Sequence, residues 1–191
     1  MTDHDPLEPG TALGVVVESD RGSLPFALLH NEPLVACAAW AMGEAGIQLL
    51  DATTPWDDVR EAGMPLVWHD PLCPMTPPAF LAACVRRALS DGVPVAGVLP
   101  VTDTVKEVQP AASGPVVGET LDRDHLRRLV SPLVLTPDVV ADLDDWPPTD
   151  FRAALALLRG HGPVTFVEAP PEARRVGHVA DLRLLESVTR S

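Results

Sequence analysis

The chain has 191 residues, a length typical of one domain with a sizeable core rather than of two full domains. Its formal charge of −13 at pH 7 argues against nucleic acid or an anionic membrane as a partner, because neutralising their phosphates requires clustered Lys and Arg. The acidic first residues contain no apolar leader, and no run approaches the roughly 20 apolar residues of a membrane span, so we expect a cytoplasmic protein.

The first half of the chain predicts two buried strands separated by a helix. The apolar run ALGVVVE suits a buried parallel strand over 12–18. The next segment, 33–43, predicts a helix opened by Pro33. A second buried strand is expected at 65–69, directly before the polar residue Asp70.

The middle of the chain continues the alternation of helices and strands. Thr76 is expected to cap a helix that ends at Gly92, and VPVAGV at 93–98 predicts another buried strand. Residues 101–108, VTDTVKEV, alternate polar and apolar side chains and predict a half-exposed strand. This strand carries Lys106, the only lysine of the chain.

The last third predicts four helices and one strand. These are a helix opened by Asp122, a helix capped by Thr136, the helix of TDFRAALALLRG, a strand over 163–168 and the closing helix of ADLRLLESV. Strands and helices therefore alternate with short connections. This alternation predicts a single α/β domain over 1–191 with three layers and a mostly parallel sheet.

The three cysteines, Cys37, Cys73 and Cys84, have no metal-binding spacing. We therefore expect unpaired thiols, and neither a disulfide nor a zinc site.

Polar residues follow three of the predicted strands, at the sheet edge where ligands of such folds bind. Asp70 could hold a divalent metal or a ribose, or it could simply form a turn before Pro71. Thr102, Thr104 and Lys106 share one face of their predicted strand and could receive a phosphate, or they could keep an exposed edge soluble.

Arg123 and Arg127 lie four residues apart on the helix that Asp122 is predicted to open. Both could face one anion, or both could pair with carboxylates on a solvated helix face.

Several segments together resemble the 2-C-methyl-D-erythritol 4-phosphate cytidylyltransferases. The most specific are VTDTVK at 101–106 and TLDR at 120–123, which are similar to segments of that family's dimerisation arm. VWHDPLCP is similar to its V-x-H-D-A-A-R-P segment, with Cys73 in place of the arginine. ARRVGHVADLRLLES resembles its final segment, with Arg175 in place of a lysine.

The resemblance implies a nucleotidyltransferase fold with a protruding arm, about 101–130, that completes the site of a neighbouring subunit. It implies that Thr104 and Arg123 bind the phosphate of the sugar alcohol and that Arg175 replaces a substrate-site lysine. It also places Lys106 on the arm and makes Asp70 the ligand of Mg²⁺ and ribose.

The first loop, ESDRGSLPF, departs from the family's glycine-rich loop. Arg21 would stabilise charge there as a catalytic residue, and the nucleotide loop would consist of Ser19, Gly22 and Ser23. Phe26 stands where the family has a lysine. Glu18 and Asp20 add two carboxylates where a triphosphate would enter, which disfavours binding of CTP.

A further departure lies between residues 44 and 64, which are too few for the family's additional strand-helix-strand unit that reads cytosine.

Three functions remain open from the sequence. One is an enzyme that joins CTP to 2-C-methyl-D-erythritol 4-phosphate and releases pyrophosphate with Mg²⁺, its activity weak or lost because the nucleotide site has eroded. Another is a non-catalytic paralogue that binds a phosphorylated metabolite or pairs with an active subunit, as a homodimer or heterodimer through the arm. The third is a nucleotide-sugar transferase of the same fold, although this function leaves the arm segments unexplained.

Overall fold

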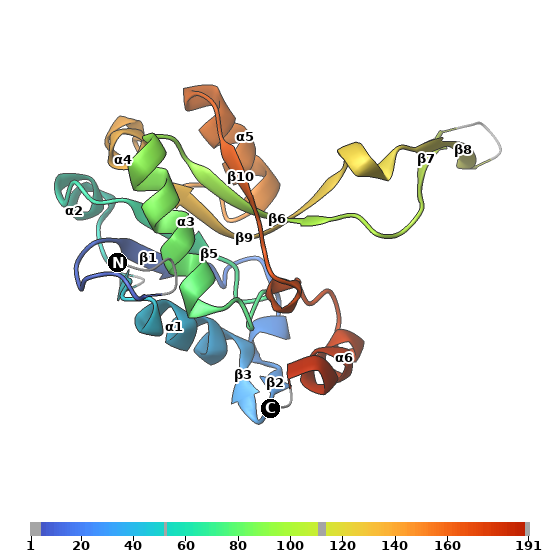
Figure 1. Ribbon diagram of the computed structural model, residues 1–191, viewed down its shortest axis with the longest axis horizontal. Helices are drawn as coiled ribbons and strands as arrows, with labels where there is room; N and C mark the ends of the chain where they lie inside the picture. The colour runs from blue at the N-terminus through green and yellow to red at the C-terminus, as the bar shows by residue number, and fades with distance from the viewer. Residues whose placement is uncertain (1–4, 52, 111–113, 190–191) are drawn as a thin grey trace.

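The structure is a computed structural model that describes residues 5–51, 53–110 and 114–189. Helices cover both faces of a six-stranded central sheet, and a two-stranded arm projects away from this body (Figure 1). This confirms the predicted three-layer α/β fold with a mostly parallel sheet. Among the described residues, none of the helices combines the length and the apolar character that crossing a membrane requires.

The sheet has the order β10-β6-β9-β5-β1-β4, and only β9 runs antiparallel to its neighbours. The strands in that order are Thr165–Glu168 (β10), Val95–Pro100 (β6), Arg127–Leu135 (β9), Leu66–His69 (β5), Leu13–Val16 (β1) and Gln48–Leu49 (β4). Because five strands point the same way, the segments that follow β1, β5, β6 and β10 gather at one edge of the sheet.

Two cores lie on the two faces of the sheet. Val67 packs with α1 and α3 on one face, whereas its neighbours Leu66 and Trp68 pack with α2, α4 and α5 on the other. This alternation explains why β5 is apolar at consecutive positions. The helices are Leu34–Glu44 (α1), Trp56–Glu61 (α2), Pro78–Asp91 (α3), Pro137–Asp142 (α4), Phe151–His161 (α5) and Val179–Thr189 (α6).

Two short hairpins stand outside the central sheet. The first pairs β2 (Leu28–Leu29) with β3 (Glu32–Pro33), and α6 packs beside it. The second is the arm, in which β7 (Val105–Gln109) pairs with β8 (Val116–Leu121). The strand predicted over 101–108 therefore begins only at Val105, and residues 111–113 of the predicted arm lie outside the described residues.

The helix predicted after Asp122 is wrong. Asp122 caps only a short 3-10 turn, Arg123–His125, by accepting a hydrogen bond from Asp124 N at 3.1 Å. Arg127 begins β9 instead, where it lies opposite Pro100 of β6. Pairing with a central strand has outweighed the local helix signal here, a tertiary effect that the sequence pattern does not report.

Two details near other elements also differ from the sequence-based expectations. Thr76 does not cap α3, because its hydroxyl donates to the carbonyl of Cys73 at 2.8 Å, whereas Gly92 ends the helix with φ +67° as expected. The segment between residues 44 and 64 contains a two-residue strand, β4, and a six-residue helix, α2, neither of which the sequence pattern predicted. In the described residues these two elements do not make up a strand-helix-strand unit, so the expectation that the family's additional unit is absent stays a prediction.

Candidate functional site

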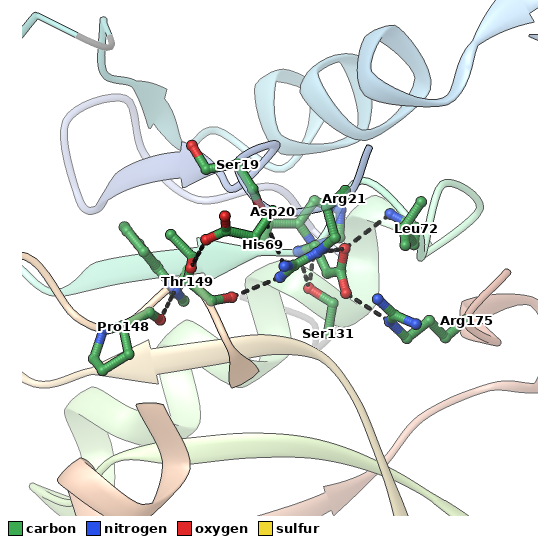
Figure 2. Close-up of polar contacts among 11 residues, drawn as sticks. Ser19, Asp20, Arg21, His69, Leu72, Ser131, Pro148, Thr149 and Arg175 are labelled. Carbon is green, nitrogen blue, oxygen red and sulfur yellow. Dashed lines mark hydrogen bonds and ion pairs between the residues drawn. The ribbon is translucent and has the colours of Figure 1, made fainter. Parts of the chain in front are cut away.

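The centre of the site is Asp70, which follows β5 directly and is buried. Its Oδ1 accepts from Arg21 Nε at 3.2 Å and from Leu72 N at 3.1 Å, and its Oδ2 accepts from Arg175 Nε at 2.8 Å (Figure 2). These arginines come from the segments after β1 and β10, at the sheet edge where parallel strands end. One carboxylate therefore joins two guanidinium groups, and the trio keeps one excess positive charge.

Two buried polar residues hold the backbone at Asp70 in place. Ser131 of β9 accepts a hydrogen bond from Asp70 N at 3.0 Å, and its hydroxyl also contacts His69 Nδ1. Burial lowers the pKa of His69 from 6.5 to about 4, although the nearby Asp70 carboxylate opposes this shift. His69 is therefore neutral at pH 7 and does not add charge to the site.

Arg21 is held in place by contacts to three different segments. Its Nη1 donates to the carbonyl of Ser19 at 3.2 Å and its Nη2 donates to the carbonyl of Thr149 at 2.6 Å. The Thr149 hydroxyl in turn donates to Asp20 Oδ2 at 2.6 Å, and the guanidinium lies 5.8 Å from the centre of the Phe151 ring. The Arg21 side chain is only 7% exposed, so its charge is fixed in a partly desolvated position.

A cavity of about 750 Å³ opens beside this trio. Its lining contains six arginines but only two acidic residues, Asp70 and Asp150, in a chain whose formal charge is −13. The arginines are Arg21, Arg127, Arg128, Arg152, Arg159 and Arg175. Arginine forks are well matched to phosphate and carboxylate groups, so the cavity is suited to an anionic small molecule.

Comparison with known proteins agrees with this fold. A Corynebacterium glutamicum protein named 2-C-methyl-D-erythritol 4-phosphate cytidylyltransferase is 31% identical over 181 residues, which cover 90% of this chain and 65% of that protein. A protein of the same name from Frankia casuarinae is 40% identical over 124 residues, 63% of this chain and 44% of that protein. The chain is a homologue of these cytidylyltransferases. The chain thus spans 65% or less of the length of these two relatives.

Solved structures confirm the fold of this cytidylyltransferase homologue. A crystal structure of 2-C-methyl-D-erythritol 4-phosphate cytidylyltransferase from Thermus thermophilus superposes with a TM-score of 0.67 at 18% identity, covering 93% of this chain and 98% of that one. A 4-diphosphocytidyl-2C-methyl-D-erythritol synthase from Anaerococcus prevotii gives a TM-score of 0.65 at 11% identity, covering 93% and 94%. None of the family models searched matches the chain.

The structure of the homologue brings together three of the residues that the sequence singled out. Arg21, Asp70 and Arg175 are far apart in sequence and meet in one ion-paired group. Cys73, which replaces the family's arginine, is buried in a small apolar cluster, and burial raises the pKa of its thiol to about 12. It therefore supplies neither charge nor a reactive thiolate to the site.

The predicted arm residues lie away from this group. Lys106 donates to the hydroxyl of Thr120 on the opposite arm strand, and Arg123 Nη1 donates to the carbonyl of Thr102 at 2.6 Å. Thr104 precedes β7 and is exposed. None of these residues lines the cavity described here, so within one subunit they do not join Arg21 and Asp70.

The predicted nucleotide loop folds into a tight turn. Gly22 has φ +59°, Ser23 precedes a 3-10 turn at Leu24–Phe26, and Ser19 contributes its carbonyl to Arg21. Asp20 also has a positive φ of +62°, a conformation that Asp tolerates better than most residues. The Phe26 ring, 60% exposed, stands at the family's lysine position and offers no charge to a phosphate.

Sequence reasoning missed Ser131, Thr149 and two arginines of α5. The signal for Ser131 and Thr149 was weak, because both act through short contacts to residues more than 60 positions away. Arg152 and Arg159 were recognisable, since residues seven apart on a helix share a face.

The residues around Asp70 do not fit a resident divalent cation. Both carboxylate oxygens accept hydrogen bonds from arginines, and two positive charges flank the position that a metal would take. Within residues 5–51, 53–110 and 114–189, no group of three or more His, Cys, Asp or Glu side chains could hold a metal. Among the described residues, the positive charge next to Asp70 comes from these two arginines.

Proposed function

We propose that this homologue binds a phosphorylated small molecule at the Arg21–Asp70–Arg175 group, and that its cytidylyl transfer is weak or lost. The observation that carries the proposal is the engagement of Asp70 by two arginines. The resemblance makes this carboxylate a ligand for metal and ribose, yet here both of its oxygens are already bonded. The group thus favours an incoming anion over a metal-bound nucleotide.

Arg175 is the residue best placed to receive the phosphate. Its Nε is fixed on Asp70, whereas its two terminal nitrogens make no hydrogen bond with any residue that the structure describes. The side chain is 40% exposed, so it is accessible from the cavity. Arg21 lies on the other side of the same carboxylate and adds a fixed positive charge. Two such charge-assisted contacts are each worth about 1.5–3 kcal/mol.

Transfer from CTP would lack two of the groups that the family pattern supplies. Phe26 replaces a lysine, and the turn at Leu24–Phe26 uses its backbone N–H groups internally: Phe26 N donates to Ser23 O and Ala27 N donates to Leu24 O. The triphosphate would therefore meet Arg21 but no glycine-rich cradle. Removing one electrostatic stabiliser typically reduces the rate about 100- to 1,000-fold.

Isothermal titration with 2-C-methyl-D-erythritol 4-phosphate and with CTP tests this proposal. We expect the sugar phosphate to bind in EDTA, CTP to bind weakly or not at all, and Arg175→Gln to reduce sugar-phosphate binding about tenfold or more. Arg183→Gln is the matched control, because Arg183 is exposed on α6 and lies outside the cavity.

Pyrophosphate release from CTP would contradict the proposed loss of transfer if it required both Arg21 and Asp70. The closeness of these two side chains, 3.2 Å apart, is the feature that favours an enzyme. Release from other nucleoside triphosphates with a sugar phosphate would instead identify a nucleotide-sugar transferase.

We also propose that the arm mediates dimerisation, with a second copy or with an active relative. A two-stranded hairpin is at best marginally stable alone in water, yet β7 and β8 pair only with each other among the described strands. Val108 and Val117 face each other across the hairpin and are 61% and 66% exposed. Covering these valines by a partner would stabilise the arm.

Sedimentation of the wild-type chain and of a Val108→Lys, Val117→Lys variant tests the arm. We expect the wild type to sediment as a dimer, or to form one with an active relative, and the variant to remain a monomer. A wild type that is monomeric at all concentrations, alone and with such a relative, would contradict this proposal.

A further inference from the structure

We call Arg21, Asp70 and Arg175 the inner group. The outer part of the cavity carries four arginines that do not belong to it. Arg127 and Arg128 begin β9, whereas Arg152 and Arg159 lie on α5, which packs against β9. We call these four residues the outer arginines. The one other acidic residue in the lining, Asp150, caps α5 by accepting from Ala153 N at 2.8 Å. The outer arginines therefore concentrate positive charge in an otherwise acidic chain.

Two of the outer arginines are available to a ligand. Arg152 and Arg159 are exposed and make no hydrogen bond or ion pair with any residue in the described part of the chain. Arg127 Nη1 donates to two backbone carbonyls, at 2.8 Å each, which leaves its charge unneutralised. Arg128 has only a long contact of 3.8 Å with the exposed Asp103, an interaction of little strength in water.

The spacing of these residues sets the size of ligand that they could share with the inner group. Arg152 stands at the start of α5, next to Phe151, whose ring faces Arg21. Arg159 lies seven residues further along, about 10 Å at 1.5 Å per residue. Between them, Leu155 and Ala156 form an apolar wall of the cavity. The cavity thus has cationic groups at both ends and carbon between them.

We propose that the outer arginines bind a second anionic group, so that the ligand is a small organic bisphosphate held without a divalent cation. One phosphate lies at Arg175 and Arg21, at the end of the cavity where Phe151 and Arg152 begin α5, and the other lies at Arg159, beyond the apolar wall. The carbon chain between them covers Leu155 and Ala156. This inference rests on the proposed function, because it names the ligand class of the same cavity.

A matched pair of probes separates this inference from the proposed function. Butane-1,4-diol bisphosphate and butane-1,4-diol monophosphate share a skeleton and differ by one phosphate. In titrations with EDTA, we expect the bisphosphate to bind at least about tenfold more tightly than the monophosphate, because it makes one additional charge-assisted contact. An Arg159→Gln variant should lose this preference and still bind the monophosphate. Arg183→Gln should keep the preference.

The other outcomes are each decisive. Equal binding of the two probes by the wild type, or a preference that survives in Arg159→Gln, overturns the bisphosphate inference and leaves the proposed function standing. Failure of both probes to bind overturns both. The inference is also wrong if the double variant Arg152→Glu, Arg159→Glu dissociates a dimer and the wild type shows no preference for the bisphosphate. The outer arginines would then contact a partner subunit.

Discussion

Replacing Asp70 by Asn tests whether the ion-paired group holds the site together. The substitution keeps the shape of the side chain but removes its charge, and the new amide would face Arg175 Nε, a donor now 2.8 Å from Oδ2. Arg21, with a side chain only 7% exposed, would lose its counter-ion. Breaking a buried ion pair costs about 3–5 kcal/mol. We expect about 3 kcal/mol, the lower end, because Arg175 is 40% exposed.

Urea unfolding measures this loss directly. A loss of about 3 kcal/mol corresponds to a fall in melting temperature of about 6–12 °C for a chain of this size. Inorganic phosphate should restore part of the stability of Asp70→Asn, because it places negative charge between the two guanidinium groups, whereas chloride at equal ionic strength should not. The control is Asp91→Asn, which breaks the exposed pair with Arg87 and should change stability by about 0.5 kcal/mol or less. An Asp70→Asn protein within about 1 kcal/mol of the wild type, and indifferent to phosphate, would refute the reasoning.

Three further predictions concern the core. The folded pKa of His69, about 4, lies below its ordinary 6.5, so stability is full above pH 6.5 and falls by about 3 kcal/mol as the pH drops to about 4. Urea unfolding of a His69→Gln variant across that pH range should show a smaller loss of stability than the wild type. An identical loss would exclude His69 as the source of the pH dependence. Iodoacetamide at pH 8 should modify half-buried Cys37 before Cys73 and Cys84, because burial raises the pKa values of those two thiols to about 12. Peptide mass spectrometry measures the order of modification, and earlier labelling of Cys73 or Cys84 would contradict this prediction. Gly97→Ala should reduce the free energy of unfolding by about 1–3 kcal/mol, because the alanine Cβ would lie 2.8 Å from a carbonyl oxygen of β9. Urea unfolding that gives the same free energy for the variant and the wild type would contradict this prediction.

The strongly patterned elements of the fold were predictable from the sequence. The buried strands β1, β5 and β6 are short apolar runs, and Gly92 ends α3 in the left-handed conformation that favours glycine. The helix predicted after Asp122 failed for a non-local reason. Residues 127–135 join the sheet between β5 and β6, and the energy of that pairing depends on partners that a local pattern does not contain.

The candidate site was predictable only in part, for a similar reason. Arg21, Asp70 and Arg175 stood out because each stands at a position that corresponds to a family site residue, and the topology brings them to one sheet edge. Their mutual pairing was not predictable, since it depends on which oxygen each guanidinium reaches in space. Thr149 is the clearest case, because it holds Arg21 through a backbone carbonyl, a group that every residue carries.

The tryptophans give the protein an intrinsic optical signal near its site. Trp68 stacks on Trp146 with ring centres 5.9 Å apart, and Trp56 lies 4.9 Å from Trp146. Trp68 Nε1 also donates to the carbonyl of Pro148 at 3.2 Å, one residue before the segment that holds Arg21. The chain has no tyrosine, and its fourth tryptophan, Trp40, is 63% exposed and accessible to a quencher such as iodide. Emission that survives quenching therefore arises mainly from the buried Trp56 and Trp68, and it reports any shift of residues 148–151 when an anion enters the cavity.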